Sequence, residues 1–171
     1  TGVQTCALPI SPKENNVINI IPESEELGYV GKPKNINKEK ILNFINNKQI
    51  PIVVPLGLGD DGRIYNINAD VAAGSIAKEI DARRLLLMTD VEGVLDENQK
   101  LISEINLNKA NEMLKNNIIS GGMIPKINTC LDAISNGVRG VVIVDGRKPH
   151  SILFELFSDK GAGTLIRKWI I

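Results

Sequence analysis

The sequence predicts an α/β fold: a three-layer α/β/α sandwich with a mostly parallel central sheet. Short apolar, β-branched runs at 50–58, 84–89 and 138–145 indicate buried strands. Segments with apolar residues at helical spacing lie between these runs, and such alternation is typical of parallel sheets. One hairpin is expected at 59–62, because the Asp-Gly pair there supplies the positive φ of a tight turn.

Helices are expected at 37–47, from 68–70 onward, and at 106–117, 123–136 and 149–157. Asn136-Gly137 supplies a C-cap for the helix that begins at 123. A last strand is expected at 163–167. Sheets of this kind bind ligands where their strands end at the carboxyl edge. A site is therefore expected among the loops at 66–70, 89–96, 120–126 and 145–150.

Composition narrows the class of function. The chain has 171 residues, 43% apolar and 23% charged, and 20 basic residues balance 20 acidic ones. A net charge near zero points to neither a nucleic-acid partner nor a membrane surface, and no apolar run approaches the roughly 20 residues that span a bilayer. The cysteines, Cys6 and Cys130, suggest neither a disulfide framework nor a metal site, so we expect a reducing, cytoplasmic location.

The first ten residues differ in character from the rest. The segment TGVQTCALPI lacks an initiator Met, joins abruptly to a polar stretch and resembles a translated sequencing-adapter tail. We therefore expect 1–10 to be non-native. Residues 11–171 are then expected to form the C-terminal part of a single domain that is incomplete at its N-terminus. A genuine strand or loop at 1–10 is the alternative.

Amide and carboxylate side chains gather in the segment YNINAD at 65–70. Asn66 and Asn68 are two residues apart, so on a strand they share a face, and Asp70 follows where a helix begins. An amide donates to a substrate carboxylate or acetamido oxygen and still accepts elsewhere, and a carboxylate beside it orients a lysine. The alternative is structural, because Asn and Asp routinely cap helices and shape turns.

The segment ISGGMIPK at 119–126 has the features of a phosphate site. Its two glycines let the backbone approach a ligand closely, and the helix start presents free N–H groups to an anion. Lys126 falls in the first helical turn, where the helix dipole disfavours a cation unless an anion lies nearby. An exposed lysine after an ordinary Gly-rich loop is the alternative. We expect Lys126 and the turn around residue 70 to meet across one cleft.

The segment TDVEGVLD at 89–96 follows an apolar strand. Asp90 is suited to accept from a ribose hydroxyl or an adenine amine, and Gly93 allows close packing. A solvated loop that ends a strand is the alternative. No GxxxxGK[ST] or GxGxxG pattern occurs in the chain, which argues against a P-loop kinase and a Rossmann dehydrogenase.

In this order and spacing, GDDGRIYNINAD, LLLMTDVEGVLD and ISGGMIPK resemble the acetylglutamate kinase branch of the amino-acid kinase family. ELGYVG, VDGRKPH and GAGTLI extend the likeness over about 27–166. The resemblance implies the amino-acid kinase fold. It also implies phosphoryl transfer from ATP, bound with Mg²⁺, to the side-chain carboxylate of N-acetyl-L-glutamate in arginine biosynthesis. Such transfer depends on positioning and charge neutralisation, and the acceptor is already ionised at neutral pH.

The same resemblance assigns a role to each candidate residue. Lys126 would contact the transferring phosphoryl group, and Asp70 would organise the catalytic lysines. Asn66 would contact N-acetyl-L-glutamate, with Asn68 nearby. Adenine and ribose would be held by residues of two loops: Thr89, Asp90, Val91, Gly93, Val94, Leu95, Ile119, Gly122 and Met123.

The sequence also departs from the family pattern. It shows no counterpart of the family's upstream lysine, its second Gly-rich loop or the arginine that holds the substrate carboxylate, so we expect this chain to be inactive alone. The resemblance also implies that the full-length form is a homo-oligomer. His150, Glu155 and GAGT resemble the arginine-feedback site of regulated members, which makes arginine a further candidate ligand. Two alternatives stay open: a related kinase for glutamate, aspartate, carbamate, UMP or carrier-linked aminoadipate, and a non-catalytic nucleotide- or amino-acid-binding module.

Overall fold

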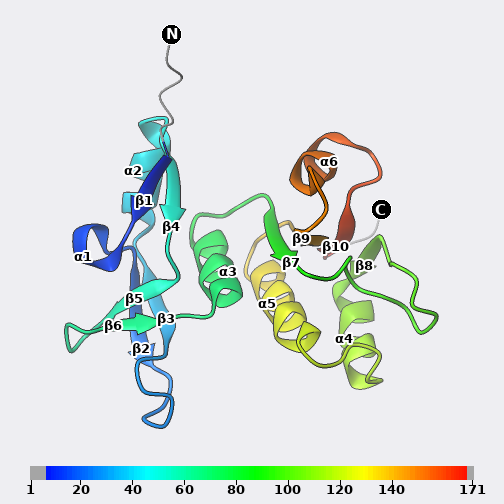
Figure 1. Ribbon diagram of the computed structural model, residues 1–171, viewed down its shortest axis with the longest axis horizontal. Coiled ribbons are helices and arrows are strands. Elements are labelled where there is room, and N and C mark those ends of the chain that lie inside the picture. Colours follow the sequence, from blue (N-terminus) through cyan, green and yellow to red (C-terminus); the bar gives the residue numbers. More distant parts are fainter. Residues whose placement is uncertain (1–6, 169–171) are drawn as a thin grey trace. The chain divides into compact units, whose positions relative to one another are not determined.

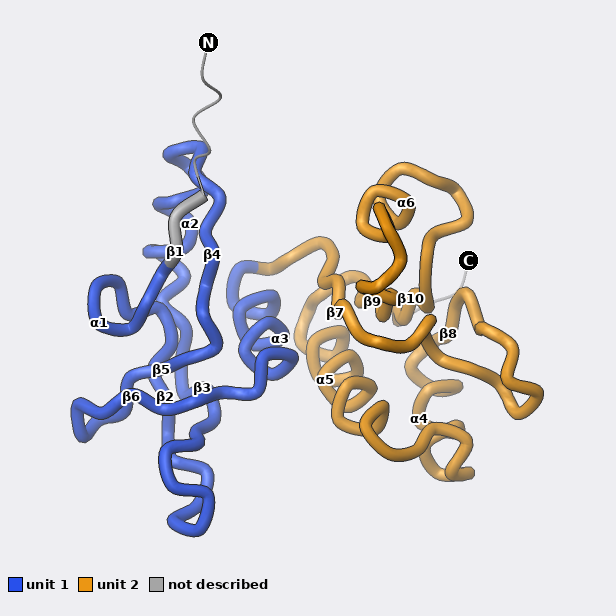
Figure 2. The backbone as a smooth tube through the Cα atoms, viewed as in Figure 1, with its two compact units in different colours: residues 1–80 blue, residues 81–171 orange. Residues whose placement is uncertain are grey.

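Strands and helices alternate along the chain in the computed structural model, which describes residues 7–168 (Figure 1). The predicted α/β class is confirmed. The chain divides into two compact units, 1–80 and 81–171, coloured separately in Figure 2. The boundary falls between α3 (Ala69–Glu79) and β7 (Leu85–Thr89).

Unit 1 contains two sets of strands. β1 (Ala7–Ile10) pairs in parallel with β4 (Ile50–Val53). The other set has the order β3-β2-β5-β6 and consists of β2 (Ile18–Pro22), β3 (Gly31–Ile36), β5 (Leu56–Gly59) and β6 (Ile64–Asn66). In this set β2 and β5 are parallel, and the two outer pairs are antiparallel.

The core of unit 1 forms where these strands meet its helices. α2 (Lys38–Asn46) contributes Ile41, α3 contributes Ala72, and the short α1 (Pro12–Asn15) lies against β5. The Asn37 side chain caps α2 by accepting from the Lys40 N–H at 3.0 Å. The buried cluster consists of Ile10, Val17, Ile18, Ile20, Ile41, Tyr65, Ile67 and Ala72. Burying each large apolar side chain contributes roughly 1.5–3 kcal/mol.

The prediction of one buried strand at 50–58 is wrong. The run divides into β4 and β5, which belong to different sets of strands, and the break falls at Val54-Pro55. Proline has no N–H to give to a strand ladder, so a continuous strand is not favoured there. β4 is also not buried on both faces, since Ile50 is 66% exposed and Ile52 is 50% exposed.

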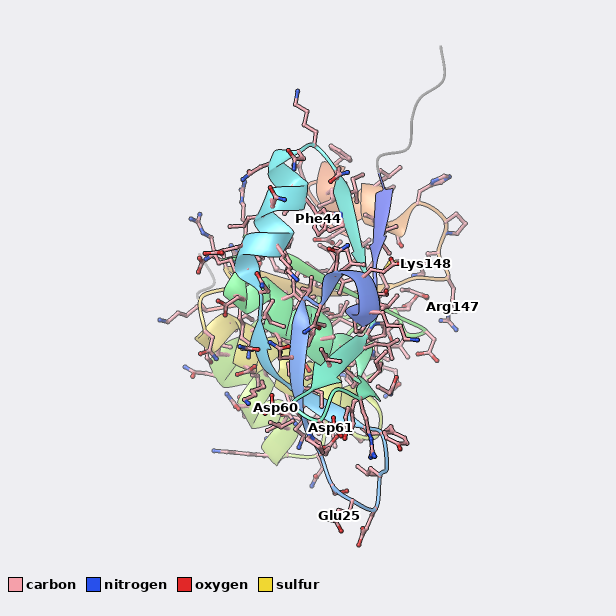
Figure 3. The ribbon with its side chains drawn as sticks, turned by 90° about the vertical axis from the view of Figure 1, so that its left-hand side faces the viewer. Glu25, Phe44, Asp60, Asp61, Arg147 and Lys148 are labelled. Atoms are coloured by element: carbon pink, nitrogen blue, oxygen red, sulfur yellow. The ribbon has the colours of Figure 1, made fainter. Side chains whose placement is uncertain are left out.

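The predicted hairpin at 59–62 is confirmed and joins β5 to β6. The Gly62 N–H donates to the Gly59 carbonyl at 3.0 Å, and Gly62 has φ +76°. Asp60 and Asp61 lie at this turn (Figure 3). Asp61 accepts from the Arg63 N–H and from the Tyr65 hydroxyl, and these hydrogen bonds hold its pKa below the ordinary value.

The start of the chain was left out of the predicted fold. Residues 1–6 lie outside the described residues. Residues 7–10 form β1, whose last residue, Ile10, is buried in the core of unit 1. This segment therefore takes part in the fold, as the alternative of a genuine strand predicts. The assignment of 1–10 as non-native stays a prediction.

Unit 2 is built on one sheet with the order β7-β9-β10-β8. β9 (Gly140–Asp145) is buried along its whole length and pairs in parallel with β7. β10 (Gly163–Arg167) is antiparallel to β9 and parallel to β8 (Glu104–Asn106). Figure 1 shows α4 (Leu107–Lys115) and α5 (Met123–Ser135) on one side of the sheet and α6 (Ser151–Phe157) on the other. Unit 2 thus has the three predicted layers.

Candidate functional site

Two loops of unit 2 line adjoining hollows near the end of β7. One hollow, of about 400 Å³, is lined by Thr89, Asp90, Val91, Ser120, Gly122, Met123 and Lys126. The other, of about 290 Å³, is lined by Val91, Gly93, Val94, Leu95, Asp96, Gln99, Ile118, Ile119, Ser120 and Met123. The hollows share three residues and form one surface. All nine residues predicted to hold adenine and ribose therefore line it, and Lys126 lines its first part.

The loop after β7 is shaped by contacts with β10. Thr164 on β10 is fully buried, accepts from the Val94 N–H at 2.8 Å and donates to the Ile102 carbonyl at 2.6 Å. Gly93 has φ +147°, and a Cβ added there would lie 2.5 Å from Thr164 Oγ1. The close packing expected at Gly93 is thus present, and it needs a glycine on grounds of both φ and space.

The far end of this loop closes on itself. The Asp96 carboxylate accepts from the N–H groups of Asn98 and Lys100, both at 2.8 Å, and Leu95 forms an antiparallel bridge with Leu101. This turn brings Asp96 and Gln99 to the second hollow. Sequence reasoning did not select either residue, although Asp96 ends the quoted segment TDVEGVLD.

The second wall comes from the start of α5. Gly122 is the N-cap residue, and a Cβ added to Gly121 or Gly122 would meet nothing within 4 Å, so the backbone adjoins open space. The expectation of free helix-start N–H groups is partly wrong. The Met123 N–H donates to the Ser120 carbonyl at 3.3 Å, and the Ile124 N–H donates to the Gly121 carbonyl at 3.2 Å. Ser120 lines both hollows and was also not selected, although it lies within ISGGMIPK.

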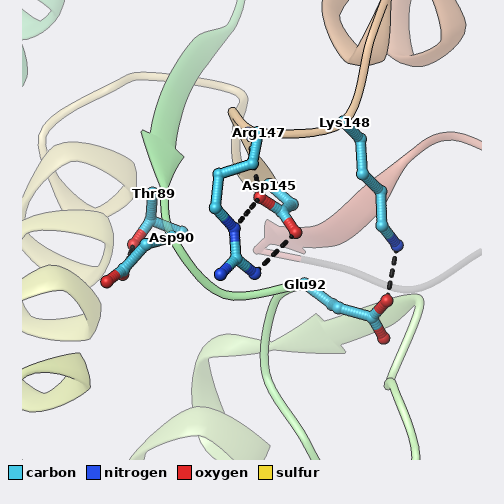
Figure 4. A network of polar contacts seen from close by, with 6 residues as sticks. All are labelled: Thr89, Asp90, Glu92, Asp145, Arg147 and Lys148. Atoms are coloured by element: carbon cyan, nitrogen blue, oxygen red, sulfur yellow. Dashed lines mark hydrogen bonds and ion pairs between the residues drawn. The ribbon is translucent and has the colours of Figure 1, made fainter.

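The end of β9 lies beside the end of β7. Thr89 and Asp145 are register partners, and the Gly146 N–H donates to the Thr89 carbonyl at 2.8 Å. The buried Asp145 carboxylate accepts from Arg147 Nε and Nη2, both at 3.0 Å, and from the Arg147 N–H (Figure 4). These hydrogen bonds lower the pKa of Asp145 to about 2, against the opposing effect of burial. Sequence reasoning noted this turn without assigning Asp145 or Arg147 a role.

The predicted substrate residues belong to unit 1. Asn66 and Asn68 are exposed and alternate with buried Tyr65 and Ile67. β6 ends at Asn66 and Asn68 is the N-cap of α3, so the strand spacing used to pair the two amides does not extend to Asn68. The Asn68 side-chain oxygen accepts from the N–H groups of Asp70 at 3.0 Å and Val71 at 3.2 Å.

The structural alternative, a helix cap, is therefore realised at Asn68. Asp70 is half-buried in the first turn of α3, where a carboxylate favours the helix dipole. Because Lys126 lies in the other unit, its meeting with these residues across a cleft stays a prediction.

Two further observations concern metal ions and membranes. Among residues 7–168, no group of three or more His, Cys, Asp or Glu is placed to hold a metal ion. Mg²⁺ commonly binds through substrate phosphates and water rather than an all-protein cage. In the same part of the chain, no helix combines the length and the apolar character that crossing a bilayer requires.

Comparison with known proteins shows the family to which the chain belongs. A sequence profile of the amino acid kinase family matches residues 2–145, and the chain belongs to that family. It is 58% identical over 159 residues to the acetylglutamate kinase of Pelagibacter ubique. The matched region covers 93% of this chain and 55% of that protein. The chain thus spans about half the length of the curated relatives it matches.

Solved structures agree on the fold. The protein smu.665 of Streptococcus mutans matches with a TM-score of 0.79 and 33% identity, covering 94% of this chain and 60% of that one. The N-acetylglutamate synthase of Neisseria gonorrhoeae, solved with coenzyme A and N-acetyl-glutamate, matches with a TM-score of 0.88 at 22% identity, covering 99% of this chain and 39% of that one. The second likeness concerns the fold alone.

Proposed function

We propose that this chain is the nucleotide-binding part of an acetylglutamate kinase. The whole enzyme would transfer a phosphoryl group from MgATP to the side-chain carboxylate of N-acetyl-L-glutamate in the cytoplasm, within arginine biosynthesis. The observation that carries the proposal is the joint surface of the two hollows. Residues chosen from two separate segments for adenine, ribose and phosphate all line it.

The lining suits the parts of a nucleotide. Apolar side chains from Val91, Leu95 and Met123 offer a surface for a base, and polar groups at Thr89 and Asp90 lie at the start of the 89–96 loop. Ligand sites commonly combine an apolar wall with a few placed polar groups in this way.

The phosphate end is the part near Lys126. In this proposal the ammonium of Lys126 stabilises charge on the transferring phosphoryl group. Mg²⁺ bound with the nucleotide would supply further charge neutralisation. The acceptor carboxylate is ionised at neutral pH, so no side chain of this protein has to remove a proton. Asn66 contacts N-acetyl-L-glutamate in unit 1, and Asp70 orients the lysines.

Binding of MgAMP-PNP to the chain, measured by isothermal titration calorimetry, tests the nucleotide site. Lys126→Ala should weaken binding about tenfold or more, because hydrogen bonds to charged groups contribute about 1.5–3 kcal/mol. Lys109→Ala is the matched control, since Lys109 lies on α4 and pairs with Glu112 on the same helix. Equal affinities for the two variants would contradict the role of Lys126.

Transfer is tested with a joined protein: the upstream part of the Pelagibacter ubique acetylglutamate kinase fused to this chain. Acyl phosphate trapped as the hydroxamate should appear only with ATP and N-acetyl-L-glutamate together, and Lys126→Ala should lower kcat about a hundredfold or more. Turnover of glutamate, aspartate, carbamate, UMP or carrier-linked aminoadipate instead would indicate a related kinase. Nucleotide binding without any transfer would indicate a non-catalytic module.

We propose L-arginine as a second ligand of the chain. Its candidate site is a hollow of about 370 Å³ beside α6. The buried Glu155 carboxylate lines it and already accepts from a guanidinium, that of Arg84, at 3.1 Å. His150, which the resemblance also suggested, is exposed and does not line this hollow. Calorimetry should detect L-arginine binding to the chain that Glu155→Gln weakens, with L-lysine as the control ligand. Equal heats for the two ligands would refute the proposal.

A further inference from the structure

The loop proposed to hold an anionic nucleotide is itself acidic. Asp90 lines the hollow, Glu92 follows two residues later, and Asp145 ends the neighbouring strand. Like charges repel, and the repulsion is stronger beside a protein surface than in bulk water. Binding of a polyphosphate here therefore depends on cations that offset these three carboxylates.

Two such cations follow β9 directly. Arg147 folds back over Asp145 and binds both oxygens of its carboxylate, while Lys148 Nζ lies 2.5 Å from Glu92 Oε1 (Figure 4). The hydrogen bond to Asp145 raises the pKa of Arg147, and the charges of Asp90 and Glu92 raise it further. Arg147 thus neutralises Asp145, and Lys148 neutralises Glu92.

The ion pair at Lys148 also affects which side chains face the hollows. Val91 and Gly93 line them, whereas Glu92, which lies between the two, does not. Its carboxylate is instead engaged by Lys148, so the pair keeps a negative charge turned from the ligand surface.

We propose that Arg147 and Lys148 are positioning residues of the nucleotide site: Lys148 holds the 89–96 loop through Glu92, and Arg147 neutralises Asp145, which ends the strand beside that loop. This inference rests on the proposed function. The Lys148 and Glu92 side chains are 51% and 52% exposed, and that of Arg147 is 65% exposed. Exposed ion pairs contribute little to stability, so an effect on nucleotide affinity is separable from an effect on folding.

The test uses charge reversal in the whole chain, with MgAMP-PNP as the probe in calorimetry. Lys148→Glu should weaken binding about fivefold, because it breaks the ion pair with Glu92 and adds a further carboxylate. The double variant with Glu92→Lys should return to within about twofold of the unaltered chain, because the ion pair is restored. Lys109→Glu is the matched control, with the same charge change in a pair of similar exposure (49% and 57%) on α4. Thermal midpoints of Lys148→Glu and Lys109→Glu should agree.

The role of Arg147 is tested by two substitutions, one that removes its charge and one that keeps it. Arg147→Gln should weaken MgAMP-PNP binding, and Arg147→Lys should recover part of the loss, because it restores the charge but not the bidentate geometry.

The positioning role is overturned if the charge swap fails to recover affinity, or if Lys148→Glu binds no more weakly than Lys109→Glu. In either case nucleotide binding by the unaltered chain would still support the proposed function. No binding by the unaltered chain would remove both proposals together.

Discussion

Replacing Thr164 by valine tests how the nucleotide loop is held. The Thr164 hydroxyl accepts from the Val94 N–H and donates to the Ile102 carbonyl, and the residue has no exposed surface. Valine has nearly the same shape, so the change removes two hydrogen bonds and opens no large cavity. Each partner left unsatisfied costs about 1–3 kcal/mol, which gives a loss of about 2–6 kcal/mol for the two. A loss of that size is a large part of the 5–15 kcal/mol typical of a domain.

Urea unfolding followed by far-ultraviolet circular dichroism measures this loss. With slopes of about 1–3 kcal/mol per molar urea, the midpoint should fall by about 1 M or more. Thr164→Ser is the control, because it keeps the hydroxyl and loses one methyl group, worth about 0.8 kcal/mol. If Thr164→Val proves as stable as Thr164→Ser, the hydroxyl does not hold the loop and the reasoning fails.

Five further substitutions test the nucleotide loop, the Asp145–Arg147 pair and the two asparagines of unit 1. Gly93→Ala should lower the free energy of unfolding by about 1–3 kcal/mol and weaken MgAMP-PNP binding, because Gly93 has φ +147° and a Cβ there would meet Thr164. Gly122→Ala should weaken MgAMP-PNP binding less in calorimetry, because a Cβ there meets open space. The neighbouring guanidinium lowers the pKa of Asp145 from 3.8 to about 2, so its stabilisation is present above about pH 4 and lost as pH falls through about 2. Asp145→Asn should therefore flatten the fall of the urea midpoint across that range. Asn68→Ala should lower the thermal midpoint through loss of about 1 kcal/mol of capping, whereas Asn66→Ala should leave it unchanged and raise KM for N-acetyl-L-glutamate in the joined protein.

Local chemistry made most elements predictable. The helix at 123–136 and the strand at 163–167 agree with α5 and β10 to within a residue, because apolar spacing and the Asn136-Gly137 cap act locally. The run at 50–58 was misread because hydropathy ignores hydrogen bonding, and Pro55 interrupts the ladder. β2, β3 and β8 went unpredicted, since short strands among polar residues carry weak periodic signals.

The site was predictable to the extent that it lies in motifs. Two segments with glycines and polar residues, one after a strand and one at the start of a helix, gave all the proposed nucleotide contacts. Gln99 and Ile118 also line the surface but lie outside these segments and carried no signal. The Asp145–Arg147 pair depends on the register of β9 against β7, which one sequence does not specify. At Asn68 the sequence left two roles open, because an asparagine before a helix suits both a ligand contact and a helix cap. The structure shows the cap.

The topology of unit 2 explains why segments distant in sequence form one surface. β7 and β9 are parallel and end together at Thr89 and Asp145, and α5, which leads into β9, packs against it. A helix that precedes a parallel strand runs against the strand direction, so it starts at the edge where the strands end. The Gly122 turn therefore faces the loop after Thr89, and the positive end of the α5 dipole is directed to the same edge. Lys126 adds a positive charge near the start of the same helix, where it lines the hollow and an anion would stabilise it.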